Sequence, residues 1–145
     1  MTDRNLHSTT SGSIADRAQI ERIYKLWDDA LGRRDLDAAL ALYADDASIE
    51  SPLVQQLMKT PKGIVQGKDQ LREFITRVFR NPPPQRKRFR TGFFTDGRTV
   101  TWEYPRATPD GGQMDLVEVM EIENGSISRH RVYWGWYALG LLKQH

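Results

Sequence analysis

The chain has 145 residues, a length that suits one domain built around one hydrophobic core. Its 21 basic and 19 acidic residues give a formal net charge of +2, which by itself offers no argument for nucleic-acid binding. It has no cysteine, which excludes disulfides and thiolate metal sites and fits a cytoplasmic location. It also has no uninterrupted run of about 18 apolar residues, so we expect neither a membrane span nor a membrane partner.

The first residues differ in composition from the rest. Residues 1–13 are rich in serine and threonine and lack the apolar stretch of a secretory signal, so we interpret them as a flexible N-terminal arm. Residues 14–145 are then expected to form a single domain. Its first helix is predicted to start at Ser13, which with Asp16 resembles a capping box, and to end near Gly32. Apolar side chains recur there at helical spacing, namely Ile20, Ile23, Tyr24, Trp27 and Leu31.

Two more helices and a short strand are predicted before the middle of the chain. Asp35 can cap a second helix with an apolar face of Leu36, Ala39, Leu40 and Tyr43. Residues 47–51 are predicted to form a strand that Pro52 ends. Residues 53–63 are predicted to be an irregular loop, which could close a pocket or pack flat. Gly67 precedes the third helix, whose apolar side contains Leu71, Phe74, Ile75, Val78 and Phe79.

Four strands are predicted in the C-terminal half, over residues 86–95, 98–106, 113–123 and 126–137. The segments between them contain turn-forming residues, at positions 96–97, 109–112 and 124–125. Helices followed by a run of antiparallel strands predict an α+β domain. The Asn124-Gly125 turn is the strongest hairpin signal, because both residue types tolerate positive φ.

Alternation of side chains along the last three strands predicts which residues share the inner face of the sheet. They are Val100, Trp102 and Tyr104 on one strand, Leu116, Glu118 and Met120 on the next, and His130, Val132 and Trp134 on the last. A two-residue turn would place Glu118 opposite Arg131, whereas a three-residue turn with a bulge at Gly125 would place it opposite His130. We favour the bulged turn, because it directs Val132 and Trp134 inward and the neighbouring arginines outward.

Residues 34–47, 67–71, 96–98, 123–127 and 131–133 carry motifs that resemble the nuclear transport factor 2-like superfamily, in particular its SnoaL-like branch. The resemblance spans residues 16–137. It implies a curved antiparallel or mixed sheet wrapped around three N-terminal helices, forming a cone with an internal pocket. It also implies a homodimer formed through the outer face of the sheet. It does not fix an activity, because this fold hosts several enzyme classes, ligand-binding proteins and protein-binding scaffolds.

Ketosteroid isomerases of this superfamily offer a template that can be compared position by position. Their general-base aspartate corresponds to Ser51, which cannot take a proton at neutral pH without an activating base. Their oxyanion-binding tyrosine corresponds to Trp27, and their oxyanion-binding aspartate corresponds to Glu118. Since one carboxyl position is kept and the other two are changed, the resemblance does not imply steroid-type isomerisation by the same mechanism.

Glu118 and His130 are the candidate catalytic residues, because a carboxylate and an imidazole on an apolar face are costly unless they are paired or used. They could form an acid/base pair, a polar anchor for a ligand, or a structural pair, with Arg131 as an alternative partner for Glu118. The residues expected to bind the ligand are Trp27, Ser51, Val100, Trp102, Tyr104, Met120, Val132 and Trp134.

The leading hypothesis is a cofactor-independent protein that acts on a small, flat, apolar organic molecule. If it is an enzyme, we expect proton-transfer chemistry of the isomerase, dehydratase or epoxide hydrolase type. The alternative is a non-catalytic ligand-binding protein or a dimeric scaffold whose pocket is filled by its own side chains. We expect no metal, because the sequence shows no paired-ligand spacing.

Other features have simpler interpretations. The basic cluster at residues 86–90 could contact nucleic acid, but a solvated strand edge explains it better, so nucleic acid is not an expected partner. Asp45 and Asp46 are expected in a solvated turn. Trp134 and Trp136 are expected to line the pocket or its rim together, because alternation places both on one face.

Overall fold

The computed structural model describes residues 4–80, 92–108 and 110–142, with the backbone alone for residues 4–16. Its larger sheet has six strands in the order β2-β1-β8-β7-β4-β3. These strands are β1 (Tyr43–Glu50), β2 (Ile64–Gln66), β3 (Phe94–Thr95), β4 (Thr99–Glu103), β7 (Leu116–Glu123) and β8 (Ser126–Trp134). Strands β1 and β8 are parallel and the other neighbours are antiparallel, so the sheet is mixed and remains open. Together with the helices it confirms the predicted α+β fold.

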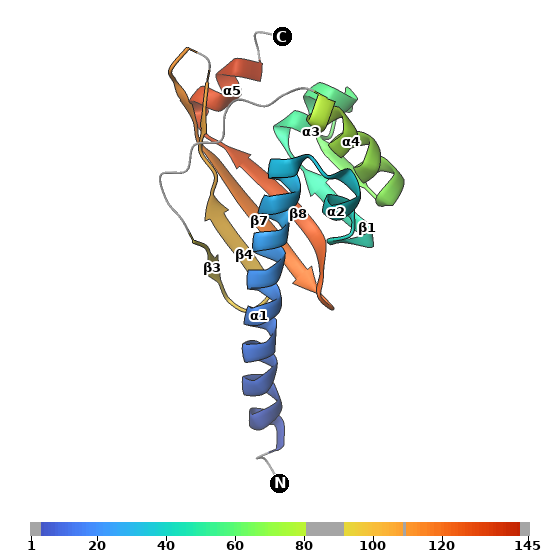
Figure 1. The fold of residues 1–145 in the computed structure, drawn as a ribbon, viewed down its shortest axis with the longest axis vertical. Coiled ribbons are helices and arrows are strands. Elements are labelled where there is room, and N and C mark those ends of the chain that lie inside the picture. Colours follow the sequence, from blue (N-terminus) through green and yellow to red (C-terminus); the bar gives the residue numbers. More distant parts are fainter. Residues whose placement is uncertain (1–3, 81–91, 109, 143–145) are drawn as a thin grey trace.

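The helices of the described residues lie mainly against one face of this sheet, which we call the inner face (Figure 1). Helix α1 (Arg4–Arg33) crosses that face, and α2 (Leu36–Leu40), α3 (Pro52–Met58) and α4 (Lys68–Arg80) gather near β1. Helix α5 (Trp136–Leu142) follows β8 directly. A separate two-stranded sheet contains β5 (Arg106–Ala107) and β6 (Gln113–Met114).

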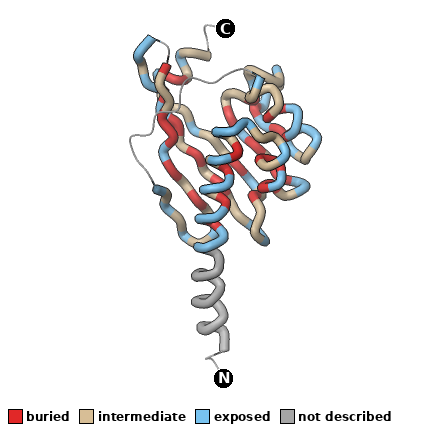
Figure 2. The backbone as a smooth tube through the Cα atoms, viewed as in Figure 1, coloured by how far each residue is buried: buried red, intermediate tan, exposed pale blue. Residues whose placement is uncertain are grey.

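The core lies between α1 and the inner face of the sheet, where Figure 2 shows buried positions on both elements. From α1 it contains Ile20, Ile23 and Trp27, each at most 3% exposed. Full burial of such side chains contributes about 1.5–3 kcal/mol each. The predicted helical spacing of these residues is confirmed, although α1 begins at Arg4 rather than at the Ser13 cap.

The prediction of an irregular loop over residues 53–63 was wrong for residues 53–58, which belong to helix α3. Ser51 is the N-cap of α3, and its side chain accepts a hydrogen bond from the Leu53 amide at 3.2 Å. Pro52 takes the first helical position, where its missing N–H costs nothing. The helix ends at Lys59, whose φ of 55° is left-handed. Pro52 therefore ends a strand and starts a helix at the same point.

Three other element boundaries differ from prediction. Tyr43 begins β1 instead of ending the second helix, whose cap at Asp35 is confirmed. The strand predicted over 98–106 divides at Pro105 into β4 and β5, because proline has no amide to donate. The last strand stops at Trp134, and Trp136 begins α5 with 86% of its surface exposed, so the prediction that it shares a face with Trp134 was wrong. The basic cluster at residues 86–90 lies outside the described residues.

The β7–β8 hairpin has a register that neither predicted turn gives. Asn124 and Gly125 form a two-residue turn with positive φ at both positions, and Glu123 pairs with Ser126. One extra residue then enters β8, so the pairing shifts between Ile122 and Glu121. The Ser128 hydroxyl donates to the Glu121 carbonyl at this bulge, at 3.1 Å.

Because of the bulge, Glu118 lies opposite Val132 rather than opposite Arg131 or His130. The bulge sits inside β8 and not in the turn, which is why the turn alone could not predict the register. The predicted inner face is nevertheless correct at its centre, since Glu118 and His130 are each 4% exposed. Arg131 pairs with Glu121 at 3.0 Å, so the Glu118–Arg131 ion pair does not form.

Candidate functional site

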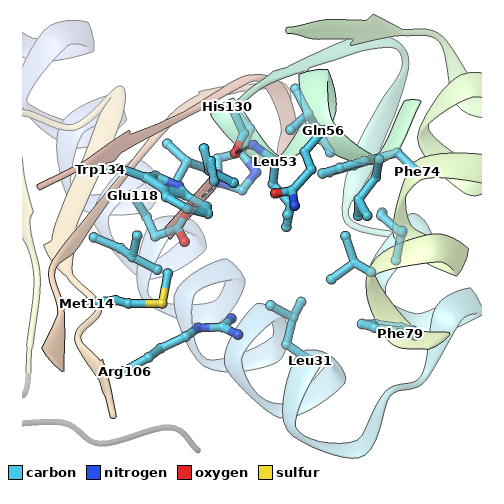
Figure 3. A pocket seen from close by; sticks show the side chains of 18 of the residues that line it. Leu31, Leu53, Gln56, Phe74, Phe79, Arg106, Met114, Glu118, His130 and Trp134 are labelled. Atoms are coloured by element: carbon cyan, nitrogen blue, oxygen red, sulfur yellow. Dashed lines mark hydrogen bonds and ion pairs between the residues drawn. The ribbon is translucent and has the colours of Figure 1, made fainter. Parts of the chain in front are cut away.

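A cavity of about 620 Å³ lies between the inner face of the sheet and the helices (Figure 3). Sheet residues on its wall include Leu116, Glu118, His130, Val132 and Trp134. Most of the helical residues on the wall are apolar, among them Leu31 from α1, Leu53 and Leu57 from α3, Phe74 and Phe79 from α4, and Leu141 from α5. The cavity is thus apolar over most of its surface, with its polar groups confined to a few places.

Glu118 and His130 come from the middle of neighbouring strands and meet in the cavity wall. They are diagonal rather than direct partners, and their side chains bridge the difference, with His130 Nε2 2.5 Å from Glu118 Oε2. Both side chains are 5% exposed. Hydrogen bonds to charged groups strengthen when water is excluded, so the buried hydrogen bond between His130 and Glu118 is stronger than the same bond would be at the surface.

Tyr43 extends the pair into a chain of hydrogen bonds. Its hydroxyl lies 2.8 Å from His130 Nδ1, and the two rings stack with centroids 6.1 Å apart. Tyr43 lies close to His130 because its strand, β1, pairs with β8. The indole of Trp27 hydrogen-bonds the same hydroxyl. Burial raises the pKa of Tyr43 well above the ordinary tyrosine value of 10.0; the Trp27 hydrogen bond opposes this shift and the charge of Glu118 adds to it.

The direction of each hydrogen bond follows from the chemistry of its groups. An indole N–H can only donate, so the Tyr43 oxygen accepts from Trp27 and the hydroxyl proton is directed to His130 Nδ1. A neutral imidazole that accepts at Nδ1 carries its proton on Nε2, which donates to the Glu118 carboxylate. We call Trp27, Tyr43, His130 and Glu118 the polar chain.

The polar chain leaves one carboxylate oxygen for other partners. Glu118 Oε2 accepts from His130, whereas Oε1 accepts no hydrogen bond from any residue that the structure describes. Oε1 is not fully enclosed by protein atoms, so it has some access to the cavity. Figure 3 shows the Glu118 side chain at the edge of the open space. The site therefore presents one hydrogen-bond acceptor whose neighbouring oxygen is held in place.

The structure brings six of the predicted site residues to the cavity wall, namely Trp27, Ser51, Glu118, His130, Val132 and Trp134. Val100, Trp102, Tyr104 and Met120 lie elsewhere, in the core beneath α1. Trp27 separates two of them from the cavity, with its ring centroid 5.3 Å from Trp102 and 5.7 Å from Tyr104. The inner face is thus divided between a packed half under α1 and an open half beside α3, α4 and α5.

Sequence reasoning missed Tyr43 and Arg106, both of which line the cavity. Tyr43 was assigned to the apolar face of a helix, although a buried tyrosine hydroxyl usually needs a polar partner. Arg106 directly follows Pro105, and the strand break at that proline was the available signal. Gln56, Thr108 and Asp110 are further polar residues on the wall.

No group of three or more histidine, aspartate or glutamate side chains is arranged to hold a metal ion among the residues that the structure describes. Within the same residues, no helix is both long enough and apolar enough to cross a bilayer.

Residues 21–130 match the family model described as the SnoaL-like domain. The chain belongs to this family. The match covers β1, α4 and β7 and ends within β8, so it includes every member of the polar chain. No curated protein matches the sequence.

Solved structures with the same fold include a SnoaL-like protein of unknown function from Burkholderia thailandensis. Its TM-score is 0.66 at 21% identity, over 81% of this chain and 95% of that one. A protein from Kribbella flavida named as a candidate ketosteroid isomerase gives 0.62 at 19%, over 81% and 78%. A Sinorhizobium meliloti protein named as a candidate polyketide cyclase gives 0.60 at 18%, over 77% and 94%. At these identities the similarity shows the fold alone.

Proposed function

We propose that this SnoaL-like protein binds a flat, mostly apolar organic molecule in its cavity and that Glu118 exchanges a proton with that molecule. The observation that carries the proposal is the polar chain in the wall of an open cavity of about 620 Å³. Ligand pockets for molecules of this kind typically measure about 300–1,000 Å³. The open volume favours this proposal over a scaffold whose pocket is filled by its own side chains.

Glu118 Oε1 is the atom we assign to proton transfer. In an isomerisation it would take a proton from a carbon next to a carbonyl, while the electron pair moves toward the carbonyl oxygen. The same carboxyl group would then return the proton at another carbon, so no co-reactant is consumed. In a dehydration the carboxylate would remove the same kind of proton while a hydroxyl group leaves as water, and in an epoxide opening it would take a proton from a water molecule that adds to the ring. The apolar wall supports this role, because exclusion of water strengthens electrostatic interactions at the reacting atoms.

His130 and Tyr43 are positioning residues in this proposal. Both nitrogens of His130 are engaged, one by Tyr43 and one by Glu118. This fixes the position of Oε2 and thereby the direction in which Oε1 points. Ser51 is not a competing base, since its oxygen caps α3. Two of the similar structures are named as a candidate ketosteroid isomerase and a candidate polyketide cyclase, which is consistent with small-molecule chemistry on this fold.

A ligand screen with one isosteric variant tests the proposal. Purified protein is screened by thermal shift against flat apolar molecules that carry a carbonyl, hydroxyl or epoxide, and turnover of each hit is followed by mass spectrometry. A ligand at about 100 times its dissociation constant stabilises the folded state by about 2.7 kcal/mol. Glu118→Gln should retain the fold and lose at least about 100-fold in turnover, in line with typical general acid–base contributions.

Glu121→Gln is the matched control, because Glu121 lies three residues away on the same strand and forms surface pairs with Arg129 and Arg131. It should retain turnover. Retained turnover in Glu118→Gln would remove Glu118 from the chemistry, and an absence of hits with the wild type would remove the ligand-binding function as well.

We also propose that the protein is a cytoplasmic homodimer that associates through the outer face of the sheet. On that face Tyr133, which is 57% exposed, pairs with the partly exposed Val117, and the pairs of Val119 with Arg131 and of Glu121 with Arg129 follow along the strands. Light scattering coupled to size-exclusion chromatography tests the association. Tyr133→Glu should convert a dimer to a monomer, whereas a wild-type monomer would contradict the assignment.

A further inference from the structure

Arg106 is a charged residue in the cavity wall without a carboxylate partner. It lies on β5, next to Met114 of β6, and Figure 3 shows its guanidinium group pointing into the open space. Its Nε atom is enclosed and has no hydrogen-bond partner, and its terminal nitrogens form no hydrogen bond or ion pair within the described residues. The guanidinium lies over the Tyr104 ring, whose centroid is 5.0 Å from Cζ.

Neither of the two carboxylates among the described wall residues, Glu118 and Asp110, forms an ion pair with Arg106. Glu118 Oε2 accepts from His130. Asp110 accepts from the Thr108 hydroxyl, the Gly112 amide and the Tyr137 hydroxyl, and these hydrogen bonds hold its pKa below the usual range. Arg106 is half-buried in a mostly apolar wall, where a charge is less well solvated than at the open surface, so an anion in the cavity would stabilise it.

From this arrangement we infer that the ligand is an apolar carboxylic acid whose carboxylate binds the Arg106 guanidinium. This inference rests on the proposed function and names the chemical class of its ligand. Arginine presents parallel N–H donors that match the two oxygens of a carboxylate. A monoanion fits better than a phosphate monoester, whose charge of about −1.5 to −2 would call for a second cation. Arg106 is the one lysine or arginine among the described wall residues.

The same geometry orients the ligand. Figure 3 shows Arg106, Met114 and Glu118 on one side of the cavity. Phe74 and Phe79 of α4 lie across from them. A carboxylate bound at Arg106 would place the apolar body of the ligand along this wall and a second position of it beside Glu118 Oε1. Repulsion between two carboxylates disfavours the reverse orientation, with the acid at Glu118.

A matched pair of probes tests the inference. Binding of 2-naphthoate and of its neutral isostere 2-naphthamide is measured by isothermal titration calorimetry at pH 7.5. The wild type should bind the acid at least about tenfold more tightly than the amide, a typical gain from a charge-assisted pair. Arg106→Gln should bind both with similar affinity, and its affinity for the amide should stay within about threefold of wild type.

Two further variants separate the outcomes. Arg98→Gln, at an exposed arginine in the turn before β4, should leave the preference intact. Arg106→Lys keeps the charge without the planar fork and should retain part of the preference, even if the glutamine variant proves unstable. Equal binding of acid and amide by the wild type would overturn the carboxylate inference and leave the ligand-binding function standing. Binding of neither probe would overturn the inference and count against the proposed function.

Discussion

Tyr43→Phe is the most direct test of the polar chain, because it removes one oxygen and changes little else. That oxygen accepts from the Trp27 indole and directs its proton to His130 Nδ1. Tyr43 is only 4% exposed, so little water can reach this position to replace the hydroxyl. The variant would leave two buried polar atoms, Trp27 Nε1 and His130 Nδ1, without their partner.

The expected magnitude follows from these two atoms. A buried donor or acceptor left without a partner costs about 1–3 kcal/mol, so the variant should lose about 3 kcal/mol of unfolding free energy. For a domain of this size, about 1 kcal/mol corresponds to about 2–4 °C in Tm, which gives a decrease of about 6–12 °C. Urea unfolding followed by the fluorescence of the four tryptophans measures the free energy directly.

Tyr133→Phe is the matched control, since Tyr133 is 57% exposed on the neighbouring part of β8. It should change stability by less than about 0.5 kcal/mol. If Tyr43→Phe were as stable as this control, the hydroxyl would not hold the chain together, and the assigned directions of the hydrogen bonds would be wrong.

The remaining predictions concern pH, a helix cap and a turn. Burial raises the pKa of Tyr43 in the folded state, so its contribution to the free energy of unfolding is complete below the unfolded value of 10.0. That contribution is lost as pH rises above 10.0 toward the folded pKa. In urea titrations above pH 10 the wild type should therefore lose up to about 1.4 kcal/mol of unfolding free energy per pH unit more than Tyr43→Phe. Ser51→Ala removes the cap of α3 and should cost about 1 kcal/mol by the same method, whereas Ser51→Asp should restore most of it. Gly125→Ala should cost about 1 kcal/mol because φ is 76° there, and an unchanged midpoint would contradict the two-residue turn.

The parity of a strand can be predicted more safely than its register. Alternation within each strand correctly predicted the buried side of Glu118 and of His130. A two-residue turn without a bulge would pair His130 with Val119 on the outer face, and the extra residue at Ser128 turns His130 to the face of Glu118. The register itself depended on that bulge, which a serine hydroxyl stabilises. No residue pattern in the two strands distinguishes Ser128 from its neighbours.

The missed helices have a different cause. Helices α3 and α5 are each 7 residues long, too short for a helical period to stand out in the sequence. Ser51-Pro52 was a readable start signal for α3, and it was interpreted as the end of a strand because both meanings apply there. These two helices also provide Leu53, Leu57 and Leu141 of the cavity wall. The predicted set of ligand-binding residues lacks these three because the helices were not predicted.

The polar chain holds a proton acceptor in place without itself carrying protons to solvent. The Tyr43 hydroxyl stays protonated at neutral pH because burial raises its pKa, and among the described residues its proton is directed only to His130 Nδ1. His130 uses both nitrogens in the chain, so a proton that reaches Glu118 Oε1 has no vacant site to move to along it. The polar chain therefore offers this proton no route away, and only the cavity side, where the ligand would lie, is left for it. This favours an isomerisation over a hydrolysis that exchanges the proton with water, and deuterium oxide separates the two: an isomerised product should retain much of its own hydrogen, whereas full deuteration at the new position would refute an enclosed proton.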